Sequence, residues 1–249
     1  MIEALINLRE MEERPYLTFV WAFLITTVAI IITSQFRSVQ GISFGFFAVL
    51  FTIIPSVYFL TVLIRREERR EEKGDRFWEI HGRDIGILLL FFFGITLAFA
   101  VWSFILPDGS FSTQVDKIQE IRGAVTQPGA FEAILANNIQ VMVVSFILSL
   151  VFGAGAVFII VWNASVLGVY IGQISQALEH IPLVSLGFLP HGIPEIGGYL
   201  AAALAGGILS ASILRRREDI MGRILLDSLK LLGLGVLLIV VGAWIEVYV

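Results

Sequence analysis

Six long apolar runs constrain this 249-residue chain more than any other feature of its sequence. Each run has about 20 residues or more, the length of helix that crosses roughly 30 Å of hydrocarbon. Apolar residues make up 57% of the chain and charged residues only 15%, whereas about a quarter of the residues in soluble domains are charged. We therefore predict an all-α integral membrane protein, with spans at 15–34, 44–64, 85–106, 139–162, 194–214 and 224–245.

A seventh apolar segment, ASVLGVYIGQISQAL at 164–178, is short and mixed. The basic loops at 65–84 and 215–223 are both predicted to be cytoplasmic by the positive-inside rule. The helix that ends at Arg215 must then start outside, so the segment 164–178 must cross outward. This topology has seven crossings, with the N-terminus inside and the C-terminus outside, and it places 13 of the 17 Lys and Arg residues inside. The alternative, a re-entrant hairpin over 164–190, would leave Arg215 outside.

The spans divide the chain into a cytoplasmic tail (1–14), a first transmembrane hairpin (15–64), a charged cytoplasmic loop (65–84) and a membrane core (85–249) with an outer loop at 107–137. The charged loop alternates pairs of bases and acids, which is typical of a solvated helical extension held by i, i+4 pairs. Its acids nearly cancel its bases, so we exclude nucleic acid as a partner. The outer loop is too short for a catalytic domain but long enough for a lid.

The stretch LPHGIPEIGGYLAAALAGGILS, at 189–210, combines polar residues with a run of small ones. Pro194 suits the first turn of a helix, and a residue before proline is pushed toward extended geometry. We therefore expect the helix to begin at Pro194, after an irregular LPHGI segment. His191 would then lie outside the helix, and Glu195 would lie in its first turn, where the helix dipole favours a negative charge. On this expectation the two side chains do not form a metal-binding pair on one helix face.

Small residues recur at every fourth position of the helix that follows. This spacing lets two helix backbones approach closely in lipid, and we favour a partner helix in the same chain over one in a second copy. The segment 164–178 carries a shorter case of the same pattern. The residues concerned are Gly198, Ala202, Gly206 and Ser210 in the first stripe and Gly168 and Gly172 in the second.

Polar residues mark the ends of the spans. Such groups are expensive at membrane depth and tend to face the protein interior. Because the segment 164–178 is short, we expect its outer end and the LPHGIPE stretch to be submerged and enclosed by protein. We predict a polar or binding cluster of His191, Glu195, Asn138 and Asn163, with Asn137, Gln173 and Gln176 as secondary members. His81 is expected at the membrane interface beside Trp78.

Three roles remain open for this cluster: hydrogen bonds that fix the fold, a pathway for a proton, ion or small solute, and a metal site. One His, one Glu and several Asn are poor ligands for zinc, and the chain has no Cys, which excludes disulfides and zinc–sulfur sites. No catalytic nucleophile is evident. We predict no cofactor and leave the metal undecided.

The stretch LPHGIPEIGGYLAAALAGG closely resembles the signature of the stage II sporulation protein M family, in which a Pro-His-Gly-x-x-Glu element precedes a small-residue helix. The sequence His-Gly-Ile-Pro-Glu resembles the form of this motif in the archaeal branch of the family. Asn138, and Asn163 with Gly168, resemble other recurrent positions of the family, and the similarity covers about 85–212. The resemblance implies a multi-pass membrane protein. In endospore formers the family member is a scaffold that recruits proteins that remodel peptidoglycan.

These observations favour a membrane scaffold for partner proteins. A transporter or channel for an ion or small solute is the alternative, and a metal-dependent intramembrane enzyme is the weaker alternative. The expected location is the cell membrane. The expected partners are the lipid bilayer, a second copy of the chain, and membrane or extracellular proteins.

Overall fold

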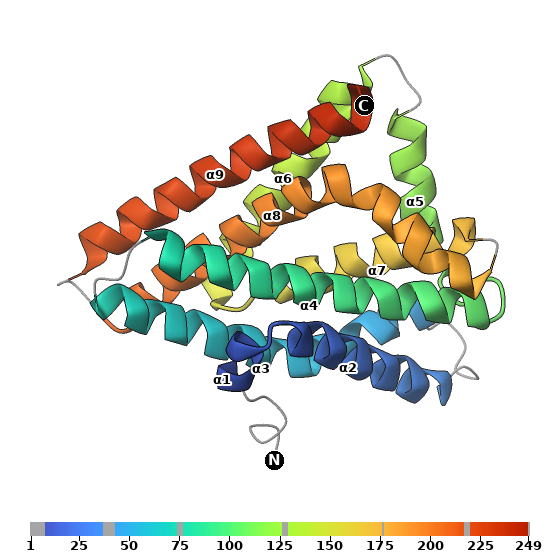
Figure 1. The fold of residues 1–249 in the computed structure, drawn as a ribbon, viewed down its shortest axis with the longest axis horizontal. Coiled ribbons are helices and arrows are strands. Elements are labelled where there is room, and N and C mark those ends of the chain that lie inside the picture. The colour runs from blue at the N-terminus through green and yellow to red at the C-terminus, as the bar shows by residue number, and fades with distance from the viewer. Residues whose placement is uncertain are drawn as a thin grey trace. The chain divides into compact units, whose positions relative to one another are not determined.

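The computed structural model describes residues 8–36, 43–73, 77–125, 129–175, 177–216 and 220–248. Within these ranges every regular element is a helix and none is a strand, which confirms the predicted fold class (Figure 1). In chain order the elements are α1 (Leu8–Glu13), α2 (Tyr16–Ser34), α3 (Phe44–Lys73), α4 (Phe77–Ile105), α5 (Ser112–Val125), α6 (Ala130–Phe152), α7 (Val157–Ile174), the short 3-10 helix η2 (Leu178–His180), α8 (Ile181–Leu214) and α9 (Met221–Tyr248).

Seven segments of the described chain are helical, long and apolar enough to cross a membrane. This number agrees with the seven crossings predicted above, and it identifies the chain as a multi-pass membrane protein. The segments are Tyr16–Ser34, Phe44–Arg65, His81–Ile105, Ala130–Phe152, Val157–Ile174, Leu178–Leu214 and Met221–Tyr248. Which side of the membrane each terminus occupies stays a prediction.

The break between α6 and α7 lies earlier than the sequence suggested. Helix α6 ends at Phe152, and Gly153 adopts a φ of +67°, the left-handed conformation that glycine accepts without a steric cost. The Ala156 N–H then donates a hydrogen bond of 3.3 Å to the Ser149 hydroxyl. The predicted span 139–162 was therefore wrong at its end, because apolar residues on both sides of Gly153 conceal the turn. The short span begins at Val157 instead of residue 164.

Helix α8 is continuous over 34 residues and contains both Pro190 and Pro194. The predicted irregular LPHGI segment and the helix start at Pro194 were therefore wrong. Proline removes one helical hydrogen bond, but prolines are tolerated in membrane helices because neighbouring helices and local adjustments satisfy the backbone groups that they free. As a result, His191 and Glu195 lie one turn apart on one helix, and side chains four residues apart share a helix face.

The helices form two compact units. The first comprises Met1–Pro55, Leu90–Ala130 and Val161–Leu189, and the second comprises Ser56–Leu89, Phe131–Ile160 and Pro190–Val249. Helices α3, α4, α7 and α8 each contribute several residues to both units.

In the first unit, α7 packs closely against α4 at Gly168 and Gly172. A Cβ atom added to Gly168 would lie 2.7 Å from the Cβ of Phe99, and one added to Gly172 would lie 2.5 Å from the Ala100 carbonyl oxygen. Real Cβ atoms do not approach other heavy atoms so closely, so a larger residue at either position would force the two helices apart.

Helix α5 is held in the same unit by the buried Gln114 and Ile118 and by a hydrogen bond between the Thr113 and Ser43 hydroxyls. The side-chain amide of Gln114 donates hydrogen bonds of 3.1 Å to the Gly45 carbonyl oxygen and 3.3 Å to the Ser165 hydroxyl. Gln114 therefore joins α5 to α3 and α7.

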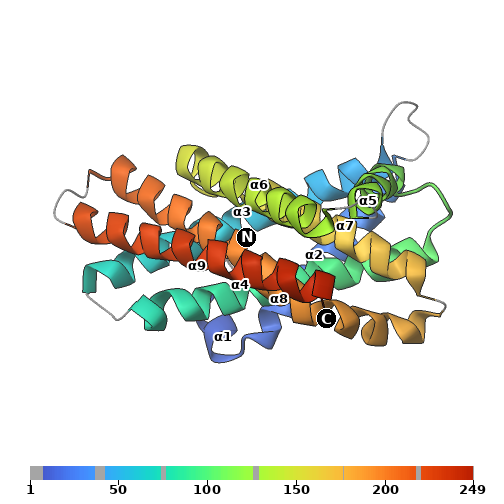
Figure 2. The ribbon, with the colours of Figure 1, turned by 90° about the horizontal axis from the view of Figure 1, so that it is seen from above.

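In the second unit, α8 lies beside α9 and α6 (Figures 1 and 2). It packs against its neighbouring helices through glycines. A Cβ atom on Gly198 would lie 2.8 Å from the Gly235 carbonyl oxygen of α9, one on Gly206 would lie 2.9 Å from the Cβ of Ser149 on α6, and one on Gly207 would lie 2.5 Å from a methyl group of Ile64 on α3. Of the most apolar part of the α8 span, 83% is buried, against 28–56% for the other six spans. Helix α8 is thus the central helix of this unit.

Candidate functional site

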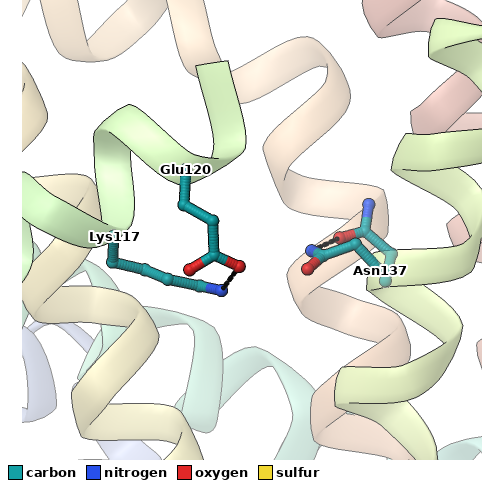
Figure 3. A network of polar contacts seen from close by, with 4 residues as sticks. Lys117, Glu120 and Asn137 are labelled. Atoms are coloured by element: carbon teal, nitrogen blue, oxygen red, sulfur yellow. Dashed lines mark hydrogen bonds and ion pairs between the residues drawn. The ribbon is translucent and has the colours of Figure 1, made fainter. Parts of the chain in front are cut away.

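A buried hydrogen bond joins α6 to α8 in the second unit. The Tyr199 hydroxyl donates to Oδ1 of Asn138 at 2.6 Å, and both residues are buried. The same oxygen accepts a second hydrogen bond of 3.3 Å from the side-chain amide of Asn137 (Figure 3). Asn137 itself is exposed, so this polar chain leads from the surface of α6 to the interior of the unit.

Glu195 lies one turn before Tyr199 on α8 and is only 9% exposed. Its carboxyl group interacts with the Asn138 side chain and with the carboxyl group of Glu246 on α9. One of its oxygens, Oε1, is buried and has no hydrogen-bond partner among the described residues. A buried carboxylate is costly unless it is paired, coordinated to a cation or neutralised.

Gly242 allows α9 to lie directly against this part of α8. A Cβ atom on Gly242 would lie 2.9 Å from the His191 carbonyl oxygen and would collide with the side chain of Glu195. Glu246 follows Gly242 by one helical turn and therefore projects from the same face of α9. The glycine thus determines how closely the two carboxyl groups can approach.

The prolines of α8 add a backbone group to this region. Pro194 has no N–H to donate to the carbonyl of Pro190, so that oxygen lacks its usual helical donor. His191, in the same turn, is partly buried. Carboxyl, amide, hydroxyl and carbonyl groups therefore gather where the helix has lost part of its own hydrogen bonding.

The predicted cluster is divided between the two units. Asn138, His191 and Glu195 belong to the second unit, with Asn137 at the surface of α6. Asn163 and Gln173 lie on α7 in the first unit, and Gln173 is exposed. Gln176 lies outside the described residues.

Sequence reasoning missed two members of the site, Tyr199 and Glu246. The sequence contains a feature that points to each of these two residues. Tyr199 follows Glu195 by four residues and so shares its helix face, and Glu246 is an acid near the end of an otherwise apolar span.

A second group of charged residues lies near the start of α9 in the same unit. Asp227 on α9 is buried, and its carboxylate accepts a hydrogen bond of 2.6 Å from the Lys230 ammonium group. The same ammonium group lies 5.2 Å from the centre of the Phe77 ring, a distance typical of a cation–π contact. The Ser228 hydroxyl donates a hydrogen bond of 3.2 Å to the Ala205 carbonyl oxygen of α8.

His81 is the first residue of the membrane span in α4 and faces the protein interior. Its expected place at the membrane interface stays a prediction. His81 is fully buried, and its ring packs edge-on against Phe77 with 4.6 Å between the ring centres. Trp78 is instead 63% exposed. The reason is helical geometry, since Asp84, one turn further on α4, is also buried and shares the inward face.

Metal ligands are few in the part of the chain that the structure describes. No group of three or more His, Cys, Asp and Glu side chains there lies close enough together to hold a metal ion. A site of the zinc type, which requires three or four such ligands, is therefore not formed by these residues.

Together, the seven apolar helices and the buried polar cluster define a polytopic helical membrane protein with ionisable groups inside its membrane core. The family model described as "Stage II sporulation protein M" matches residues 87–249. The chain belongs to this family, as its His-Gly-Ile-Pro-Glu stretch suggested. The matched region includes all members of the polar cluster.

The chain is also similar to an archaeal protein. The chain is 33% identical over 124 residues to a protein of Methanocaldococcus jannaschii described as uncharacterized, and the alignment covers 48% of this chain and 70% of that protein. No solved structure matches the chain.

Proposed function

We propose that this protein is a membrane scaffold whose outer segment, α5 and the start of α6, holds partner proteins. The observation that carries the proposal is the fixation of α5. Its inner face is tied to α3 and α7 by the buried Gln114, whereas its other face is polar and exposed. A helix held rigidly in this way loses little conformational entropy when it binds a partner.

The exposed face of α5 carries an ion pair, so this face presents charged groups to its surroundings. The Lys117 ammonium group lies 2.7 Å from the Glu120 carboxylate (Figure 3), and the side chain of Glu120 is 70% exposed. Exposed pairs of this type contribute little to folding stability, so their charges remain available for a partner. Asn137 on α6 is a second exposed polar group within the same outer segment.

The packing of α8 supports the proposal from within the membrane. Its closest contacts, at Gly198, Gly206 and Gly207, are made with α9, α6 and α3 of the same chain. A core that is packed through backbone contacts resists deformation, which suits a protein that positions others.

Site-specific photo-cross-linking tests the scaffold. A photoreactive amino acid is placed at Gln119 or Glu120 on α5, at Asn137 on α6, and at the exposed apolar Leu24 on α2 as the control. The protein is irradiated in the membranes of cells that produce it. We expect the positions on α5 and α6 to cross-link to the same partner proteins, which would appear as adducts of the same mass. Leu24 should give none of these adducts because it faces lipid.

The variant Gln114→Leu supplies the second arm of this experiment. It removes the two hydrogen bonds of Gln114 that help to fix α5 and leaves the exposed face unchanged, so the adducts should weaken while the amount of protein stays constant. Adducts of equal yield at Leu24, or none at the polar positions, would contradict the scaffold.

Transport of an ion or small solute is the second candidate, and one observation favours it. The buried Oε1 of Glu195 is an ionisable group inside a membrane span, and such groups often mark ion or proton pathways. Flux through liposomes that contain the purified protein, lost in Glu195→Gln, would support transport over a scaffold.

A further inference from the structure

The Glu195–Glu246 pair brings two carboxyl groups together between α8 and α9. Two independent observations place them near each other. The carboxyl groups interact directly, and both also act electrostatically on the Tyr199 hydroxyl. In addition, Gly242 lets the α9 backbone contact the turn from His191 to Glu195, and Glu246 lies one turn beyond it.

The surrounding segments offer these acids almost no positive charge. The stretches that form the site, 130–142, 190–199 and 239–248, contain no Lys and no Arg, and His191 is their only basic residue. The pair can therefore carry up to two negative charges, one of them on the buried Glu195. Its unpartnered Oε1 leaves an acceptor that nothing in the described chain satisfies. A bound cation or a proton would offset the cost of this burial.

The groups of the pair that can bind a cation are the carboxylate oxygens of Glu195 and Glu246. The Tyr199 hydroxyl lies within electrostatic range of both carboxyl groups and donates its hydrogen bond to Asn138. Oxygen atoms of carboxylates, amides and carbonyls are the ligands of hard cations such as Ca²⁺ and Mg²⁺, which complete their coordination with water. The same donors suit zinc or copper poorly.

We infer that the Glu195–Glu246 pair forms a binding site for a hard divalent cation, held between α8 and α9. Glu246 is exposed and Glu195 is buried, so the cation enters past Glu246 and is held by the buried oxygen of Glu195. A bound cation joins the middle of α8 to the last turns of α9 and offsets the buried negative charge. The inference goes beyond the scaffold and does not depend on it.

Equilibrium dialysis of the purified full-length protein in an uncharged detergent tests the site, with Ca²⁺ and Mg²⁺ as separate probes at neutral pH and constant ionic strength. We expect saturable binding of about one cation per chain. Glu195→Gln and Glu246→Gln should each weaken binding by about tenfold or more. The matched control is Glu120→Gln, which removes an exposed carboxylate on α5 and should leave binding unchanged.

Thermal unfolding in the same detergent provides an independent measurement. A cation that binds only the folded state raises the unfolding midpoint, so the probe that binds in dialysis should stabilise the wild type and Glu120→Gln but not Glu195→Gln. Glu195→Gln keeps the shape of the side chain and removes the buried charge, so it should fold. The absence of saturable binding of either probe, or equal binding by Glu195→Gln, would overturn the inference. It would also be overturned if mild acid without metal stabilised the wild type and added cation did not, since the pair would then hold a proton.

Discussion

The hydroxyl of Tyr199 on α8 lies 2.6 Å from Oδ1 of Asn138 on α6 and donates a hydrogen bond to it. Both groups are buried, so water cannot replace either partner. We expect Tyr199→Phe to lower the free energy of unfolding by about 0.6 kcal/mol, the average measured for hydrogen bonds between membrane helices, and by no more than about 1.7 kcal/mol, the largest measured value. The measurement is unfolding of the purified protein in detergent. Tyr16→Phe, at a side chain that is 57% exposed, should change the stability by far less.

Glycine substitutions test the packing of α8. The Cβ of Gly206→Ala would lie 2.9 Å from the Cβ of Ser149 and 3.0 Å from the Leu150 backbone nitrogen, and neither can move without moving α6. We expect a loss of about 1–3 kcal/mol in unfolding free energy, typical of overpacking. The control is Gly233→Ala on α9, where nothing lies within 4 Å of the added atom. It should be neutral or slightly stabilising because alanine favours the helix. Equal effects at the two positions would contradict the packing described for α8.

His81 and His180 form a second matched comparison. Because His81 is fully buried against Phe77, His81→Ala should leave a cavity and cost about 2 kcal/mol or more. His180 is exposed at the end of η2, so His180→Ala should cost little. The measurement is the thermal unfolding midpoint of each variant compared with that of the wild type, and we expect a larger decrease for His81→Ala than for His180→Ala. A stability unchanged by His81→Ala would be inconsistent with its burial. His81 is for the same reason unsuitable as an inert control for substitutions at His191 or Glu195.

Two ion pairs with the same i, i+3 spacing differ in the burial of the acid. The carboxylate side chain is 5% exposed in the pair of Lys230 with Asp227 and 70% exposed in the pair of Lys117 with Glu120. Lys230→Ala leaves a buried acid without its cation and should cost on the order of 2 kcal/mol. Lys117→Ala should cost less than about 1 kcal/mol. If added salt weakened both pairs equally, the difference in burial would have no energetic consequence.

The predicted membrane topology can be tested by labelling, since the chain has no Cys and single cysteines can be introduced freely. An impermeant maleimide should label Glu120→Cys in intact cells and Arg215→Cys only after the membrane is opened, because the positive-inside rule places the first outside and the second inside. The opposite pattern would reverse the orientation of every span.

The sequence alone determined the class of the protein. Runs of about 20 apolar residues cannot remain in water and must become helices in lipid, so the fold class and six of the spans followed from length and composition. The seventh crossing followed from the positions of the basic loops. The His-Gly-Ile-Pro-Glu stretch was sufficient to suggest the family. Glu195 and Asn138 could be selected as candidates because polar residues are expensive in a membrane, whichever helix lies beside them.

Only the tertiary structure decided which groups meet and where the helices break. Local propensity predicted a helix start at Pro194, yet α8 continues through both prolines, because packing and neighbouring polar groups can offset a missing backbone hydrogen bond. Gly153 ended α6 inside an unbroken apolar run. Glu246 lies 51 residues after Glu195 in the sequence, and no local pattern could pair them. Their proximity depends on the contact of Gly242 with α8, a property of two helix surfaces and not of either segment alone.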